Sequence, residues 1–388
     1  MKMKKVVVAD IVRTPWGKPN GSLERFMSSD LGAAALKKLL QRSNLEPEAV
    51  DQVIFGQAHP STMPNNIGHY AWLKAELPVE VPGYTVQSNS ASALQALRSA
   101  YYLIASGNEE ICIAGGADSY SAAPFVMRDV RNHFYAKDRR VIDTIEEAEC
   151  CTQPVSATRL EQYKAAHGTE LSDAAKAFAA ESKRKALAFA ERCGGQIVSV
   201  SYTDRRKGEI VISDDEWLKS NVADVLAPYA DGVAAALVMS EEAAVKWGLT
   251  PCAELLGFAV AGCSPELPHN AGAAATLKLL KAKGVSMNDI ACAEIIENSA
   301  EDVFDTLEAI GGSPAVNPLG GALAYGKNDG AEGIAMLQRL AASLHAGQLG
   351  VLTIYSAGGL GMAALVKGCE TIGRPGTDDG SSPGNLSS

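Results

Sequence analysis

Cysteine is the residue type in this chain best suited to metal or redox chemistry, but the spacing of the cysteines argues against both. No two of them form a C-x-x-C pair, so a zinc site has little support, and we expect no bound metal. Most lie among apolar neighbours, as is typical of reduced packing residues in a cytoplasmic protein. The eight cysteines are Cys112, Cys150, Cys151, Cys193, Cys252, Cys263, Cys292 and Cys369.

Two clusters of basic residues could hold an anionic ligand. Arg128 and Arg131 form one, and Arg205, Arg206 and Lys207 form the other. Both could meet phosphate groups, although a solvated surface run is the competing interpretation. The net charge of −10 argues against a nucleic-acid binder. The Gly-Gly segments also lack the G-x-G-x-x-G pattern of a dinucleotide site.

Such residues must be positioned by a fold, and the pattern of elements predicts an α/β protein. A helix at 91–105 is followed by a strand at 111–114 that runs into Gly115-Gly116. The same order returns as a helix at 333–345, a strand at 351–355 and Gly358-Gly359. This repetition predicts an internally duplicated fold.

The duplicated halves are expected at 1–118 with 226–255, and at 256–370. Residues 119–225 carry charge clusters and a long amphipathic helix at 172–192, and we interpret them as an inserted domain. Residues 371–388 are rich in Gly, Ser, Pro and Asp, which predicts a disordered tail. No apolar run reaches the roughly 18 residues needed to cross a bilayer, so no membrane association is expected.

Four segments in this order resemble the thiolase family over roughly residues 4–368. They are Val7–Pro15, Pro78–Val86, Ala114–Pro124 and Asn317–Ala322. The resemblance implies the thiolase fold: two similar five-stranded α/β halves in layers, plus a loop domain that grips coenzyme A. The inserted domain is therefore expected to bind coenzyme A through one of the two basic clusters. The resemblance also implies an acyl-CoA substrate, with coenzyme A present as part of that substrate and no permanently bound cofactor.

The residues that perform ordinary thiolase chemistry are replaced. Ser90 stands where the family has a nucleophilic cysteine, at the start of a helix whose free N–H groups can stabilise an oxyanion. Its hydroxyl is either catalytic or a helix cap. Lys327 replaces the histidine base of the G-H-P segment; it could activate Ser90 if it lost its proton, or it binds an anion or points to solvent.

Two other family positions are also altered. The asparagine of N-E-A-F aligns with Ile296, so the site could rely on the neighbouring Glu297 and Asn298. Tyr355 replaces the second cysteine; it could transfer a proton or simply fill the pocket. The backbone N–H groups of Ser90 and Ala357 could still form an oxyanion hole.

These features leave two classes of function open. The first is an enzyme acting on acyl-CoA, either by acyl transfer through Ser90 or by an aldol-type or Claisen-type C–C cleavage with Tyr355 as acid or base. The second is an inactive subunit that scaffolds an active thiolase. The resemblance implies at least a homodimer, and a zinc-ribbon/OB-fold protein as a further partner.

Overall fold

The computed structural model describes residues 3–60, 65–127, 140–151, 172–191, 197–220 and 226–369, together with Lys164 and Gly168. The expected tail at 371–388 therefore lies outside the described residues. Ten strands are hydrogen-bonded in the order β12-β11-β13-β14-β10-β1-β9-β4-β2-β3.

The five N-terminal strands of this sheet, β1, β2, β3, β4 and β9, form the first half, and the five C-terminal strands, β10 to β14, form the second half. Counted along the chain, the first strand of each half pairs antiparallel with the fifth, the fifth pairs antiparallel with the fourth, and the remaining pairs are parallel. The predicted duplication is thereby confirmed. The strands are β1 (Val6–Arg13), β2 (Gln52–Gly56), β3 (Gly83–Val86), β4 (Ile111–Asp118), β9 (Gly232–Ser240), β10 (Ala253–Gly262), β11 (Ile290–Ile295), β12 (Ala315–Val316), β13 (Leu349–Ser356) and β14 (Leu360–Gly368).

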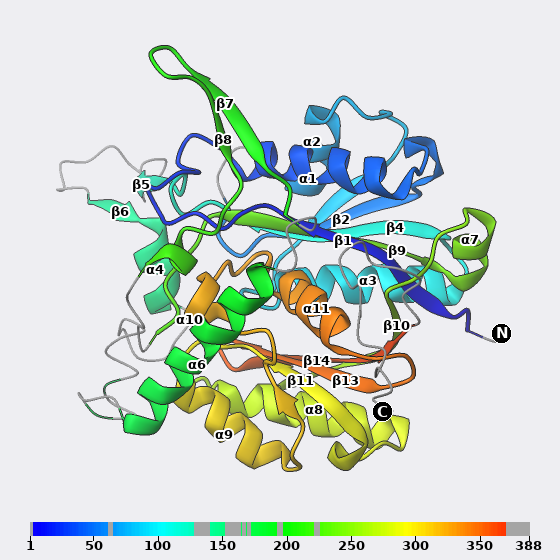
Figure 1. Cartoon of the computed structure of the whole chain (residues 1–388), viewed down its shortest axis with the longest axis vertical. Helices are drawn as coiled ribbons and strands as arrows, with labels where there is room; N and C mark the ends of the chain where they lie inside the picture. Colours follow the sequence, from blue (N-terminus) through cyan, green and yellow to red (C-terminus); the bar gives the residue numbers. More distant parts are fainter. Residues whose placement is uncertain are drawn as a thin grey trace, which may run out of the picture.

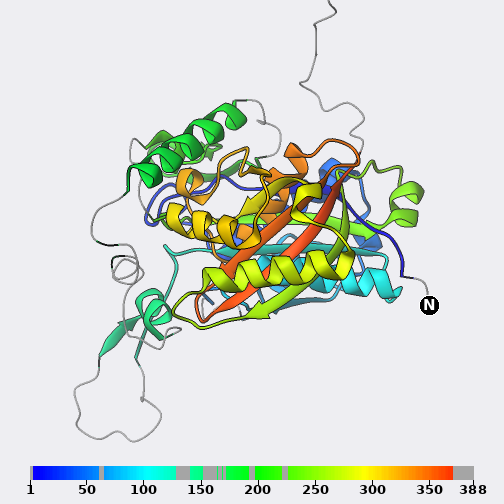
Figure 2. The ribbon, with the colours of Figure 1, turned by 90° about the horizontal axis from the view of Figure 1, so that it is seen from below.

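Helices separate and cover the two sheet halves, so the molecule has five layers (Figure 1). One pair of helices covers the first half, a second pair lies between the halves, and a third covers the second half. Seen from below, the third pair lies over the strands of the second half (Figure 2). These helices are α1 (Ser28–Ser43) and α2 (Ile67–Lys74), α3 (Ser92–Ser106) and α11 (Glu332–Ser343), and α8 (His269–Lys283) and α9 (Ala300–Ile310).

Layers this close together require small residues at the contacts. A Cβ on Gly333 of α11 would lie 2.6 Å from the backbone nitrogen of Leu94 in α3. Ten of the twelve residues of α11 are buried, including polar ones, because the helix has a sheet on both sides. The two sheet halves themselves join through three residue pairs between β1 and β10.

The central layer contains buried charges. Arg339 of α11 lies 3.1 Å from the Glu294 carboxylate and 2.9 Å from that of Glu332. Nearby, Arg13 makes two hydrogen bonds of 2.6 and 2.7 Å to Asp215. Arg339 thus faces two carboxylates with a single positive charge. Burial raises the pKa of Glu294 to about 8.

Several elements lie between β4 and β9 in sequence. Helix α6 (Asp173–Ala190) packs against α9 and α10 (Ala322–Tyr325). The hairpin of β7 (Val200–Asp204) and β8 (Gly208–Ile212) projects beyond the layered body (Figure 1). The remaining elements are β5 (Phe125–Met127), β6 (Val141–Asp143) and α4 (Thr144–Cys151). The expected domain boundaries stay predictions.

Candidate active site

Ser90 lies in the tight turn between β3 and α3. The turn depends on Asn89, whose φ of 48° lies in the left-handed region that asparagine tolerates. The Ser92 side chain stabilises the turn. Its hydroxyl accepts a hydrogen bond from the Ser88 N–H at 2.8 Å and donates one to the Asn89 carbonyl at 2.6 Å. Helix α3 begins after Ala91 without a side-chain cap. Ser92 thus stabilises the turn, and capping of α3 does not account for the buried Ser90.

Contacts between the halves bring the loops that carry Ser90, Lys327 and Ala357 together. The Asn89 amide donates to the Ala357 carbonyl at 3.2 Å, which joins the Ser90 turn to the turn between β13 and β14. A Cβ on Gly116, near the end of β4, would lie 1.9 Å from the carbonyl oxygen of Gly330. The segment containing Lys327 and Gly330 then leads into α11, which packs on α3.

Lys327 is buried in an ion pair. Its Nζ lies 2.7 Å from Oδ1 of Asp329, and both side chains are at most 7 % exposed. The other oxygen of Asp329 accepts from the Tyr120 hydroxyl at 2.9 Å and lies 3.3 Å from Nε2 of His59. Burial alone would raise the pKa of Asp329, but Lys327 and His59 hold it well below its usual value. A buried carboxylate favours the charged ammonium, so the neutral-lysine base considered from the sequence is disfavoured.

A second carboxylate lies beside this ion pair. Oδ1 of Asp118 accepts from the backbone N–H of His59 at 3.1 Å, and Oδ2 accepts from that of Gly330 at 2.7 Å. Burial raises the pKa of Asp118 to about 6. Burial alone would lower the pKa of His59, but Asp329 and Asp118 together raise it.

Sequence reasoning missed His59, Asp118 and Asp329. A signal for two of them was present: His59 and Asp118 stand at the carboxyl ends of the parallel strands β2 and β4, the edge where ligands bind in such sheets. The segment after β2 also meets the Ser90 loop, because the Gln87 amide donates to the Ala58 carbonyl at 3.1 Å.

Tyr355 lies buried at the end of β13 with an acid–base pair beside it. The His269 ring stands 6.4 Å from the Tyr355 ring, at 85° to it. Nδ1 of His269 lies 3.5 Å from Asp302, and Nε2 lies 3.7 Å from Asp305. Although burial acts to raise the pKa of Asp302, hydrogen bonds from His269, Tyr355 and Ser299 lower it. These carboxylates and His269 were also missed, since nothing near Tyr355 in sequence indicates them.

Glu297 has a structural position. Its carboxylate accepts from Ser182 of α6 at 2.8 Å, from the Asn317 amide at 2.8 Å and from the Leu323 N–H at 3.1 Å. Both of its oxygens thus hold α6 against the second half, and a catalytic role for Glu297 stays a prediction.

Asn298 is different, because its Oδ1 is buried without a hydrogen-bond partner among the described residues. Its side chain can therefore still serve a ligand. Ile296 donates its backbone N–H to Thr353 and is buried, as expected for a residue that binds no water.

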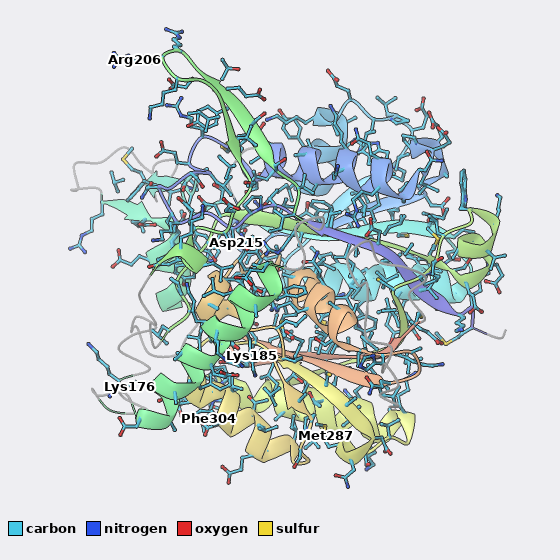
Figure 3. The ribbon with its side chains drawn as sticks, viewed as in Figure 1. Lys176, Lys185, Arg206, Asp215, Met287 and Phe304 are labelled. Atoms are coloured by element: carbon cyan, nitrogen blue, oxygen red, sulfur yellow. The ribbon has the colours of Figure 1, made fainter. Side chains whose placement is uncertain are left out.

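Of the basic residues predicted to bind coenzyme A, only those of the second cluster are described. Arg205, Arg206 and Lys207 form the tip of the β7–β8 hairpin, where Arg206 stands at the outer end (Figure 3). Arg128 and Arg131 lie outside the described residues. Within the described ranges, no group of three or more His, Cys, Asp or Glu side chains is arranged to hold a metal ion. None of the described helices is both long and apolar enough to cross a membrane.

Comparisons with known proteins show the family to which the chain belongs. Residues 6–242 match the family model of the thiolase N-terminal domain, and residues 249–368 match that of the thiolase C-terminal domain. An acetyl-CoA acetyltransferase of Chromobacterium violaceum is 30 % identical, over 93 % of this chain and 99 % of its own length. A beta-ketoadipyl-CoA thiolase of Pseudomonas putida is 31 % identical, over 94 % of this chain and 100 % of its own.

A solved structure supports the same relationship. The crystal structure of the acetyl-CoA acetyltransferase of Bacillus anthracis superimposes with a TM-score of 0.86 at 27 % identity, covering 95 % of this chain and 99 % of that one. The fold expected from the sequence is thus confirmed.

Proposed function

Because the chain belongs to the thiolase family, we propose that it is an enzyme acting on acyl-CoA thioesters, and that it breaks or forms a C–C bond without acylating Ser90. The ion pair of Lys327 with Asp329 carries this proposal. An ammonium held by a buried carboxylate is a poor base for Ser90, but it is a good electrostatic partner for a developing negative charge.

The chemistry that suits a fixed cation and a buried phenol is an aldol cleavage of a 3-hydroxyacyl-CoA. Tyr355 accepts the proton of the substrate hydroxyl as it passes its own proton to Asp302. The C2–C3 bond breaks, its electron pair enters the thioester as an enolate, and C3 becomes a ketone or aldehyde. The Lys327 ammonium stabilises the enolate oxygen.

The reaction is completed without water or a co-reactant. Tyr355 passes the substrate proton to C2, which gives the shortened acyl-CoA, as Asp302 returns the other proton to Tyr355. The backbone N–H groups of Ser90 and Ala357 are the candidate donors to the oxygen on C3, because the Asn89 contact holds their two turns together. The reverse sequence is an aldol addition.

The test uses the purified chain with any protein that copurifies with it. It is incubated with 3-hydroxyacyl-CoA substrates, and the carbonyl product is trapped and identified by mass spectrometry. We expect Ser90→Ala to retain activity and Tyr355→Phe to lose roughly 10²-fold or more. Ordinary acetoacetyl-CoA thiolysis should be slow in all variants.

Two results would replace this function with another. An acyl ester on Ser90, detected in the intact wild-type protein and absent from Ser90→Ala, would establish acyl transfer instead. No turnover with or without copurifying protein, together with capture of an active thiolase chain, would support the scaffold.

Assembly is also part of the proposal. Strand β3 lies at the end of the described sheet, so its outer edge can pair with a second copy of the chain.

A further inference from the structure

Two carboxylates lie at the loop that carries Lys327, and one lysine cannot balance both. Asp329 is in direct contact with Lys327, and Asp118 is held next to the same loop by the Gly330 N–H. With both carboxylates ionised, the group of Lys327, Asp118 and Asp329 carries a net charge of −1. Such a group would oppose a thioester enolate, since a like charge in a buried site is unfavourable.

His59 is the second cation available at this point. Its Nε2 faces Oδ2 of Asp329 at 3.3 Å, on the opposite oxygen from Lys327, and its own backbone N–H binds Asp118. Protonation of His59 brings the net charge of the group from −1 to 0. The His59 side chain is 13 % exposed, against 5 % for Lys327 and 7 % for Asp329, so it exchanges its proton with water more readily than they do.

Aromatic side chains fix the His59 ring. Tyr120 stacks on Tyr229 with ring centroids 4.3 Å apart and planes at 22°, and the His59 ring stands 5.0 Å from Tyr120 and 6.3 Å from Tyr229. Tyr120 also donates to Asp329. Burial raises the pKa of Tyr120 well above its usual value, so Tyr120 adds no charge, and the charged groups that act on His59 among the described residues are Asp118, Asp329 and Lys327. With water largely excluded, each of these charges acts at short range and with little screening.

We propose that protonated His59 is a positioning residue for Lys327: it balances Asp118 and Asp329, so that the Lys327 ammonium can stabilise the enolate of an acyl-CoA. This inference rests on the proposed function, because the enolate is its intermediate. The sign of the pH effect follows. Asp329 and Asp118 raise the pKa of His59, so it keeps its proton to a higher pH than a free imidazole does, and enolate stabilisation declines as the pH rises through that pKa.

The first measurement needs no substrate. The six histidines are followed by NMR in the unliganded protein, and the His59 signal is the one lost in His59→Gln. Its pKa should lie above 6.5 and should fall by about one or more in Asp329→Asn. If Asp329→Asn does not fold, Asp118→Asn provides the same test. A pKa of His59 at or below 6.5 that ignores both carboxylates overturns the proposal.

The second measurement uses acetoacetyl-CoA as the probe, because its enolate has an ultraviolet absorbance that the keto form lacks. We expect the wild-type protein to favour the bound enolate at pH 7 and Lys327→Met to abolish the effect. His59→Gln should reduce it roughly ten-fold, and the difference from wild type should vanish at high pH. His345→Gln, at an exposed histidine, is the matched control and should behave as wild type.

The outcomes separate the two ideas. If Lys327→Met abolishes enolate formation but His59→Gln matches wild type, the role of His59 is refuted and the proposed function stands. If the wild-type protein does not favour the enolate although His59 titrates as expected, the proposed function fails, and the role of His59 fails with it.

Discussion

Replacing Glu294 with glutamine should stabilise the protein at alkaline pH. Glu294 and Glu332 share the single cation of Arg339, and one oxygen of each carboxylate has no hydrogen-bond partner among the described residues. If both carboxylates were ionised, the one positive charge of Arg339 would not balance them. Burial therefore raises the pKa of Glu294 from 4.5 to about 8. Glutamine has the shape of the protonated acid and cannot ionise.

The magnitude follows from the two pKa values. Between pH 4.5 and pH 8 the unfolded chain releases the Glu294 proton while the folded protein keeps it, so wild-type stability falls as the pH rises. The gap between 4.5 and about 8 corresponds to about 5 kcal/mol of unfolding free energy. Wild type and Glu294→Gln should therefore be similar at pH 4.5, and the variant should be more stable by about 3–5 kcal/mol at pH 9.

Urea unfolding followed by tryptophan fluorescence at pH 5, 7 and 9 measures this difference. The matched control is Glu241→Gln, the same chemical change at an exposed residue that pairs with Lys5. The control should shift stability by a similar small amount at every pH. The reasoning is refuted if the difference between wild type and Glu294→Gln stays constant from pH 5 to pH 9.

Three further predictions concern packing, assembly and ligand binding. Gly116→Ala should cost about 2–3 kcal/mol in thermal unfolding and weaken activity, because the new methyl meets the Gly330 carbonyl, whereas Gly262→Ala, with no atom nearer than 3.8 Å, should be nearly neutral. Light scattering on dilute protein should give at least a dimer, since the 83–86 strand is an open edge; a stable monomer near 40.6 kDa would contradict this. Neutralising residues 205–207 should weaken coenzyme A binding several-fold at low salt, and unchanged affinity would remove that segment from the ligand site.

The sequence predicted the duplicated halves because each repeat carries its own local signals. The helix expected at 91–105 ends at Gly107, which has the left-handed conformation that ends helices. The strand expected at 111–114 extends to Asp118 through Gly115-Gly116, which lack side chains and so admit Phe55 and Gly330 at close range. The local sequence pattern therefore predicts where helices and strands occur, whereas tertiary packing determines where the strand ends.

The site was less predictable, because its charges are paired by tertiary contacts. His59 and Asp329 stand 270 positions apart in the chain, and only the docking of the two halves brings them together. A lysine considered alone could be a base or an anion site, and the choice depends on whether a carboxylate lies beside its ammonium group. The local sequence does indicate the Lys327–Asp329 ion pair, because Asp329 follows Lys327 by two positions.

The junction between the halves also bears on how the protein unfolds. Three residue pairs between β1 and β10 join the sheets, and the Asn89–Ala357 and His59–Asp329 contacts cross between the halves. A small relative rotation of the halves would break these contacts while leaving every strand within each half paired. Loss of activity should then precede loss of secondary structure on heating, and during biosynthesis the second half must emerge and dock before the site exists.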